Sequence, residues 1–168
     1  STSSRATIGG MAGNNSCGSR SIRYGNMVHN VLSVEAILAN GSKAHFRRLN
    51  GDSGDGISEE LIQQLLSLGR READEIKQRF PNLLRRVGGY NIDELIKDSP
   101  NFGRLLVGSE GTLGFFQRIH LQLQPIPKEK VLGVCHFPTF YEAMESTQHI
   151  VKLDPTAVEL VDRTMIDL

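Results

Sequence analysis

Two glycine-rich segments are the part of this sequence best suited to bind a ligand through the backbone. They read GGMAGNNSCG at residues 9–18 and GSEGTLG at residues 108–114. Glycine loses more backbone freedom on folding than any other residue, and its missing side chain leaves neighbouring N–H groups accessible. Such N–H groups can line an anionic ligand such as a pyrophosphate. The alternative, that both segments are turns without a ligand, stays open because Gly, Asn and Ser favour turns anyway.

Neither segment matches a standard nucleotide-binding fingerprint. Ile8 occupies the first glycine position that G-x-G-x-x-G requires before Gly10 and Gly13, and Gly-Lys-Ser/Thr occurs nowhere. The five histidines lack the spacing of a metal site, so we expect each to be structural and predict no metal ligands. Cys17 and Cys135 form no C-x-x-C pair, which favours ordinary cysteines in a reducing compartment.

The composition is that of a globular protein. The chain has 168 residues, of which 39% are hydrophobic and 23% charged, enough for one core. Lysine plus arginine equals aspartate plus glutamate, at 19 each, so no net field recruits nucleic acid. No apolar run approaches the roughly 18 residues of a membrane span. These features predict a cytoplasmic protein, with peripheral attachment at the inner membrane left open.

The pattern of apolar residues predicts both strands and helices. We expect residues 1–27 to be loop and Asn40-Gly41 to turn a β-hairpin. Ser58 should cap a helix that runs to Pro81, and a short helix with a partial capping box between Asn91 and Glu94 should reach Lys97. The glycine segment 108–114 should join a buried strand at 105–107 to a strand at 118–124 with Ile119, Leu121 and Leu123 inward.

A second unit is predicted beyond Pro125 and Pro127, which mark a boundary. Residues 131–137 favour a strand, Thr139 and Glu142 form a capping box for a helix to about Leu153, and residues 156–162 favour another strand. These elements are too few to bury both faces of a layered unit. We therefore expect the chain to be a fragment of a longer protein.

Three ordered motifs resemble a known family. TIGGMAGNNSCGSRSIRYGNMVHNVLSVEAILANGS at residues 7–42, followed by GGYNIDEL and LLVGSEGTLG, is similar to the FAD-linked oxidases related to vanillyl-alcohol oxidase. The branch is that of glycolate oxidase flavoprotein subunit, D-lactate dehydrogenase and D-2-hydroxyglutarate dehydrogenase. The resemblance implies an α+β fold, in which residues 1–127 are the second half of the FAD-binding domain, a largely antiparallel sheet with flanking helices. Residues 128–168 would begin an α+β cap domain that shapes the substrate pocket.

The resemblance also implies which residues contact the cofactor FAD. Matched position by position, the cofactor-binding residues are Thr7, Ile8, Gly9, Gly10, Asn14, Gly18, Tyr24, Glu110, Gly111, Gly114 and Phe115. Met11 and Cys17 depart from the usual asparagine and glycine of the first loop. Catalytic residues stay unknown, because the family's substrate-binding and metal-binding residues would follow residue 168. An iron–sulfur cluster of the parent protein would also lie outside this chain.

The implied activity is oxidation of a D-2-hydroxy acid to the 2-keto acid by hydride transfer to flavin N5. The partners would be FAD and a small 2-hydroxy acid, with the electron acceptor unknown. Glycolate, D-lactate and D-2-hydroxyglutarate are not separated by these residues. Two alternatives stay open: a nucleotide-binding or folding module without turnover, and a scaffold without flavin whose glycine segments are bare turns.

Overall fold

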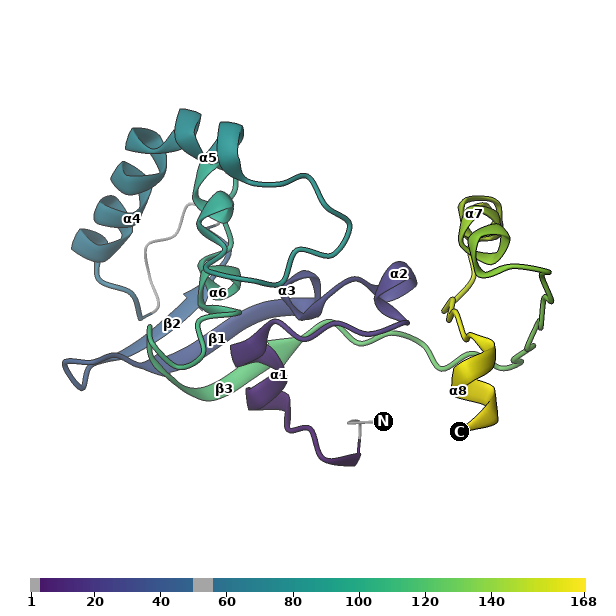
Figure 1. Ribbon diagram of the computed structural model, residues 1–168. Coiled ribbons are helices and arrows are strands. Elements are labelled where there is room, and N and C mark those ends of the chain that lie inside the picture. The colour runs from purple at the N-terminus through teal and green to yellow at the C-terminus, as the bar shows by residue number, and fades with distance from the viewer. Residues whose placement is uncertain (1–3, 50–55) are drawn as a thin grey trace.

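The computed structural model describes residues 4–49 and 56–168. Up to residue 121 they form short helices around one three-stranded antiparallel sheet (Figure 1). The strands are β1 (Val31–Ile37), β2 (Lys43–Arg47) and β3 (Phe115–Leu121). The helices are α1 (Ile8–Asn14), α2 (Ser21–Tyr24), α3 (Met27–Asn30), α4 (Glu59–Arg71), α5 (Ala73–Arg79), α6 (Phe102–Leu106), α7 (Phe140–Ile150) and α8 (Arg163–Asp167), with 3-10 turns η2 (Ile92–Ile96) and η3 (Val151–Leu153). The combination of helices with an antiparallel sheet agrees with the predicted α+β class.

The sheet has the order β2-β1-β3, so β1 is hydrogen-bonded on both edges. The predicted hairpin is confirmed: β1 and β2 pair, Gly41 adopts a φ of 82°, and the Asn40 side chain accepts a hydrogen bond from Ser42 N–H at 3.0 Å. Only glycine adopts such a positive φ without a steric cost. Val34 on β1 lies opposite Phe46 on β2. The turn therefore fixes the register of the hairpin.

One face of the sheet forms the core. Val34 and Phe46 are buried there, and Ile119 on β3 packs against the same cluster. Helix α6 lies on this face so closely that a Cβ on Gly103 would come within 2.8 Å of the Phe46 carbonyl oxygen. Turn η2 packs on α6, and α4 packs on η2, which places α4 in an outer layer (Figure 1). The opposite face is polar, with Arg118 paired to Glu35 at 2.8 Å.

The helix predicted from Ser58 is confirmed, with one break. Ser58 Oγ accepts a hydrogen bond from Leu61 N–H at 3.2 Å, as expected of an N-cap. The helix is interrupted at Glu72, where α5 begins, and it ends at Phe80, which is extended before Pro81. A residue before proline disfavours the helical region, which explains this end.

The prediction for residues 91–97 is correct in position and wrong in detail. The segment forms the 3-10 turn η2, and no capping box exists between Asn91 and Glu94. The Asn91 side chain instead donates to the Val107 carbonyl at 2.6 Å, and Glu94 accepts from Asn101 N–H at 3.1 Å. Tertiary partners have therefore replaced the local cap.

The prediction that residues 1–27 are loop is wrong. The described part of this segment contains α1, α2 and the start of α3. Thr7 caps α1, and Asn15 ends it in the left-handed region at a φ of 53°. Asparagine tolerates this conformation better than most residues and is a common helix C-cap. The high glycine content conceals these two helix signals.

The strand predicted at residues 105–107 is also wrong, because the segment belongs to the short helix α6. Asn101 caps α6 by accepting from Gly103 N–H at 2.9 Å. Leu105, Leu106 and Val107 are all buried, and a short apolar run cannot distinguish a buried strand from a buried helix. The glycine segment 108–114 consequently joins a helix, rather than a strand, to β3.

Strand β3 covers residues 115–121 instead of the predicted 118–124. Ile119 and Leu121 pack against the core as predicted, but Leu123 is 79% exposed. The ladder with β1 ends at Leu121, which pairs with Val31. Beyond that pair, alternation no longer places a side chain against the core.

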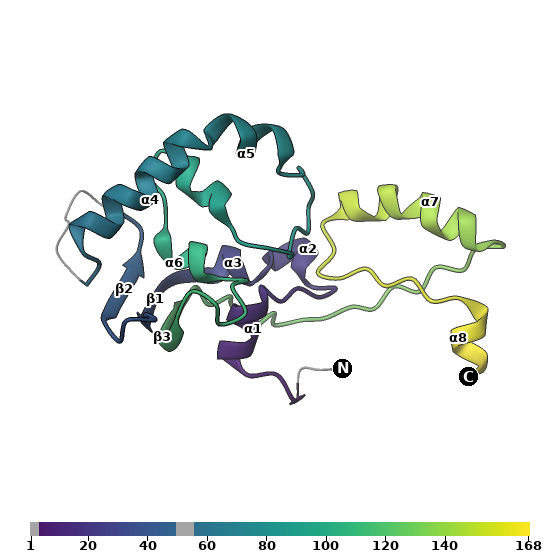
Figure 2. The same cartoon turned by 60° about the vertical axis from the view of Figure 1, so that its left-hand side comes forward.

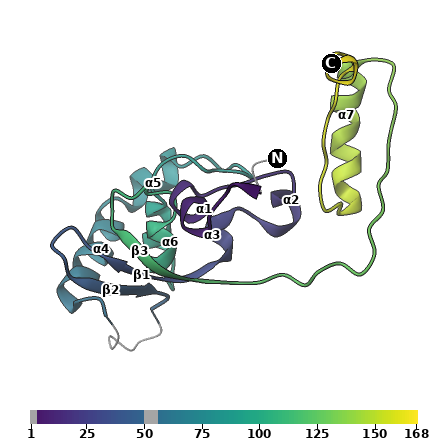
Figure 3. The same cartoon turned by 90° about the horizontal axis from the view of Figure 1, so that it is seen from below.

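Residues 122–168 extend away from the sheet (Figures 2 and 3). The capping box of Thr139 and Glu142 is confirmed at the start of α7, and η3 continues to Leu153. The strands predicted at 131–137 and 156–162 do not form. Val131 is 96% exposed, and a strand needs a partner for its backbone groups, which the described residues do not supply here.

We predict that Gly69→Ala destabilises the fold by about 1–3 kcal/mol, because overpacking costs that much in a close contact. A Cβ at Gly69 would lie 2.7 Å from the Leu95 carbonyl oxygen and 2.8 Å from its Cβ. Helix propensity alone predicts the opposite sign, since alanine favours a helix by about 1 kcal/mol over glycine. Urea unfolding followed by circular dichroism measures the difference.

Ser67→Ala, at an exposed position of the same helix, is the matched control and should change stability little. A stability gain for Gly69→Ala would show that α4 and η2 separate without cost.

Candidate functional site

Helix α1 carries the first set of predicted site residues. Thr7 Oγ1 accepts a hydrogen bond from Gly10 N–H at 3.1 Å, so this side chain holds the first turn. Ile8 follows as the first helical residue and is 50% exposed. Gly9 lies in the same turn, and a Cβ built there would meet nothing within 4 Å. The turn therefore presents an open backbone surface.

The end of α1 is joined to the second glycine segment. Gly108 N–H donates to the Ala12 carbonyl at 2.9 Å, and Glu110 N–H donates to the Gly13 carbonyl, also at 2.9 Å. Asn14 Nδ2 donates to Glu110 Oε1 at 2.8 Å. The two segments that the sequence singled out thus form one continuous surface.

Not every glycine of the second segment faces open space. At Gly108, where φ is 81°, a Cβ would lie 3.2 Å from the Gly89 carbonyl oxygen, and at Gly114 it would lie 3.1 Å from the Ile37 carbonyl oxygen. Contacts within the chain account for these two positions. At Gly111 a Cβ would meet nothing within 4 Å. Gly111 is therefore the glycine of this segment that leaves room for a ligand.

Two residues that support the surface were missed by sequence reasoning. Asn15 is fully buried; its Oδ1 accepts from Val28 N–H at 2.9 Å, which ties α1 to α3. Tyr90 places its hydroxyl 2.8 Å from Thr112 Oγ1. The asparagine after a glycine-rich run was an available signal for a left-handed C-cap. Nothing local to Tyr90 indicated its contact with a residue that follows it by 22 positions.

The remaining predicted residues have other neighbours. Gly18 N–H donates to Ser21 Oγ at 3.0 Å, and the Tyr24 carbonyl accepts from Asn30 Nδ2 at 2.9 Å. Both residues lie in the segment between α1 and α3, which contains α2 and lies beside α1 (Figure 3). Phe115, the first residue of β3, pairs with Ile37 and is 70% exposed. This exposed ring directly follows the second glycine segment in the sequence.

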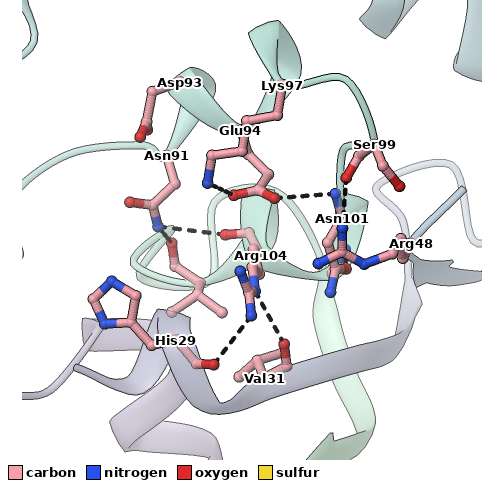
Figure 4. Close-up of polar contacts among 12 residues, drawn as sticks. His29, Val31, Arg48, Asn91, Asp93, Glu94, Lys97, Ser99, Asn101 and Arg104 are labelled. Atoms are coloured by element: carbon pink, nitrogen blue, oxygen red, sulfur yellow. Dashed lines mark hydrogen bonds and ion pairs between the residues drawn. The ribbon is translucent and has the colours of Figure 1, made fainter. Parts of the chain in front are cut away.

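A buried polar network holds the layer beneath the surface (Figure 4). Glu94 is 3% exposed and pairs with Lys97, and Arg104 donates to the backbone carbonyl oxygens of His29 and Val31. Asn91 bridges this network to Val107, immediately before the second glycine segment. The start of that segment is therefore fixed by side chains from the 91–104 region.

His29 fixes the turn that follows Tyr24. Its Nδ1 accepts a hydrogen bond from Asn26 N–H at 2.9 Å, and it packs so closely that a Cβ on Gly25 would lie 2.7 Å from it. Burial lowers the pKa of His29 from its ordinary value, and the nearby cations, Arg104 first among them, lower it further. The accepted hydrogen bond also requires an unprotonated Nδ1, so the folded state favours neutral His29.

Comparison with known proteins shows what the chain is similar to. Residues 1–47 match the family model described as FAD binding domain. The chain is 29% identical over 177 residues to D-2-hydroxyglutarate dehydrogenase of Pantoea ananatis, covering all of the chain and 17% of the relative. It is 31% identical over 164 residues to a probable mitochondrial D-lactate dehydrogenase of Danio rerio, covering 96% of the chain and 25% of the relative. It is also 26% identical to glycolate oxidase subunit GlcD of Bacillus subtilis, over 94% of the chain and 25% of the relative.

The chain is similar to proteins of the FAD-linked oxidase family. The matched model indicates FAD as the cofactor, as predicted. The chain spans only 17% and 18% of the length of the first two relatives. The activities in the names of these relatives therefore belong to proteins several times longer than this chain.

The open glycines fit this cofactor. Gly9, Gly13 and Gly18 on the N-terminal side and Gly111 on the other would each project a Cβ into empty space. Glycine is required where φ is positive or where another group comes close to the backbone, whether that group belongs to the chain or to a ligand. Of these four, Gly111 alone has a positive φ. The other three glycines leave room that no described residue of the chain occupies.

Residues 4–49 and 56–168 contain no group of three or more His, Cys, Asp or Glu arranged to hold a metal ion. No helix within the same residues is long and apolar enough to cross a membrane.

We predict that lowering the pH weakens the turn at Tyr24 through His29. Because its folded-state pKa lies below the ordinary value of 6.5, the unfolded state takes up a proton more readily. The contribution of neutral His29 to the free energy of unfolding should thus be complete above pH 6.5. It should decrease as the pH falls through 6.5 toward the folded-state pKa. His29→Gln, which keeps an acceptor for Asn26 N–H and does not titrate, should flatten this dependence.

The measurement is the urea midpoint at several pH values between about 5 and 7, the range in which histidine ordinarily changes charge. His136→Gln, exposed in the 122–138 segment, controls for the loss of any histidine. Equal pH dependence in wild type and His29→Gln would contradict the assignment.

Proposed function

We propose that the protein carrying this chain oxidises a D-2-hydroxy acid to the corresponding 2-keto acid, with FAD as the bound oxidant. The observation that carries the proposal is the junction of α1 with the 108–112 segment, which joins two sets of open glycines into one surface. The named activities of the relatives, D-2-hydroxyglutarate and D-lactate dehydrogenation among them, support the substrate class. When bound, FAD supplies the acceptor, flavin N5, for the hydride that leaves the substrate carbon.

The chain's own contribution is binding and orientation. The backbone at Gly9, Gly13 and Gly111 would approach the cofactor closely, since a Cβ at each position would meet nothing within 4 Å. Thr7 would support the cofactor surface indirectly, because its hydroxyl already accepts a hydrogen bond from Gly10 N–H. The exposed ring of Phe115 would cover an apolar edge of the cofactor. A rigid cofactor surface of this kind lowers the cost of reaching the reactive geometry.

We also propose the domain boundary that the sequence suggested. Residues 1–127 would be the second half of a vanillyl-alcohol oxidase-type FAD-binding domain, and residues 128–168 would begin the cap domain. The exposed apolar side chains of this second part support the proposal: Val131, Leu132, Val134, Tyr141 and Met144 are all more than half exposed. Such an apolar surface normally packs against other protein. The rest of the cap would cover it and would supply the substrate-binding residues.

Reduction of the bound flavin tests the activity. The full-length protein loaded with FAD should lose its oxidised-flavin absorbance under anaerobic conditions when glycolate, D-lactate or D-2-hydroxyglutarate is added. L-Lactate and L-2-hydroxyglutarate should leave the absorbance unchanged. Stoichiometric FAD without bleaching by any of the three would reject the dehydrogenase and favour a nucleotide-binding module without turnover.

We predict that Gly9→Leu weakens FAD binding by tenfold or more without destabilising the protein. A side chain at Gly9 meets nothing in the chain, and leucine favours a helix over glycine by about 0.8 kcal/mol. Any loss of affinity therefore reports a ligand in that space. The measurement is the FAD dissociation constant from flavin fluorescence, with urea unfolding for stability.

Ser67→Leu is the matched control, since it adds a leucine to an exposed position of α4, across the molecule from α1 (Figures 1 and 2). Unchanged FAD affinity in Gly9→Leu would place the cofactor elsewhere.

A further inference from the structure

Glu110 adopts a backbone conformation that its residue type disfavours. Its φ is 50°, in the left-handed region, where a non-glycine residue is strained. Gly108 and Gly111 on either side have φ values of 81° and 79°. The loop thus already uses glycine where φ is positive, and glycine at position 110 would relieve the strain. A side-chain contact must offset the cost of glutamate here.

The contact is with Asn14. Asn14 Nδ2 donates to Glu110 Oε1 at 2.8 Å, while Asn14 Oδ1 accepts from Ser16 Oγ at 3.2 Å. The donating amide and the accepting carboxylate thus engage one another across 96 positions of sequence. The same two segments are also joined by the backbone bond from Glu110 N–H to the Gly13 carbonyl at 2.9 Å. Side-chain and backbone bonds close a small ring at the junction.

We propose that Asn14 and Glu110 are positioning residues that lock the two glycine segments together, rather than residues whose side chains bind the cofactor. The lock holds Gly13 and Gly111 at a fixed separation with their open sides free, while the polar side chains are turned to one another. This inference rests on the proposed FAD function only for its ligand readout. The lock itself is a property of the chain.

Hydrogen–deuterium exchange of the full-length protein without FAD tests the lock directly. Glu110→Gly relieves the positive φ but removes the carboxylate, and Asn14→Ala removes the donor while favouring the helix. Both should raise the exchange rate of the Gly108 and Glu110 amides by about tenfold, the change that 1.4 kcal/mol of local opening produces. Glu110→Gln keeps an acceptor oxygen and should stay within about threefold of wild type.

The FAD dissociation constant supplies the second readout. Glu110→Gly and Asn14→Ala should each weaken binding by about fivefold to tenfold, and the double variant should be no weaker than either single variant, because one interaction is lost in all three. Glu110→Gln should restore affinity. A residue that contacts the flavin independently would give additive losses instead.

Failure of the lock and failure of the proposed function give different results. Unchanged exchange in both Glu110→Gly and Asn14→Ala overturns the lock, whether or not FAD binds. Equal or tighter FAD binding by Glu110→Gly also overturns it, since strain alone would then explain the data. A wild-type protein that binds no FAD rejects the proposed function, while the exchange rates still decide the lock.

Discussion

The close approach of α6 to the sheet is the contact on which the rest of this structure depends. A Cβ at Gly103 would lie 2.8 Å from the Phe46 carbonyl oxygen and 3.0 Å from Ser33 Cα, so only glycine lets the helix reach the sheet at this depth. Leu105 and Leu106 then enter the core, and η2 and α4 pack outward from α6. Since the 108–114 segment leaves directly from this helix, the position of the glycine surface follows from packing in the core.

In this surface, side chains hold the segments in place and the glycine backbone is the part that is exposed. Thr7, Asn15 and Tyr90 direct their polar atoms to other parts of the chain, which fixes α1 and the 108–112 segment in place. The glycines between them expose backbone and contribute little packing of their own. This division suits a large, flat ligand, because backbone can approach it closely while side chains supply rigidity from behind.

Sequence reasoning succeeded where the decisive interaction is local. The hairpin at Asn40-Gly41, the cap at Ser58 and the capping box of Thr139 and Glu142 all involve residues within a few positions of one another. It failed where the partners are distant, and at residues 1–27 it also missed the local caps Thr7 and Asn15 in a glycine-rich stretch. The end of α1 is stabilised by bonds to residues 108–110, which no local pattern reveals.

The remaining errors concern short apolar segments. Residues 105–107 are three consecutive buried apolar residues, and such a short run has the same sequence pattern in a buried helix as in a buried strand. Residues 131–137 have strand-like composition, but a strand forms only against a partner. Resemblance to the family implied only that residues 7–14 and 108–112 both contact FAD; their direct contact was not predicted, since their spacing alone carries no such information.

The junction between α1 and the 108–112 segment also has a consequence for unfolding. It closes a loop of 96 positions through hydrogen bonds at the surface, which are weak one at a time. A molecule bound across both segments would act as a reversible cross-link on this loop. Opening either segment would then require its release, so occupancy would protect from proteolysis the stretch of chain between the two anchor points.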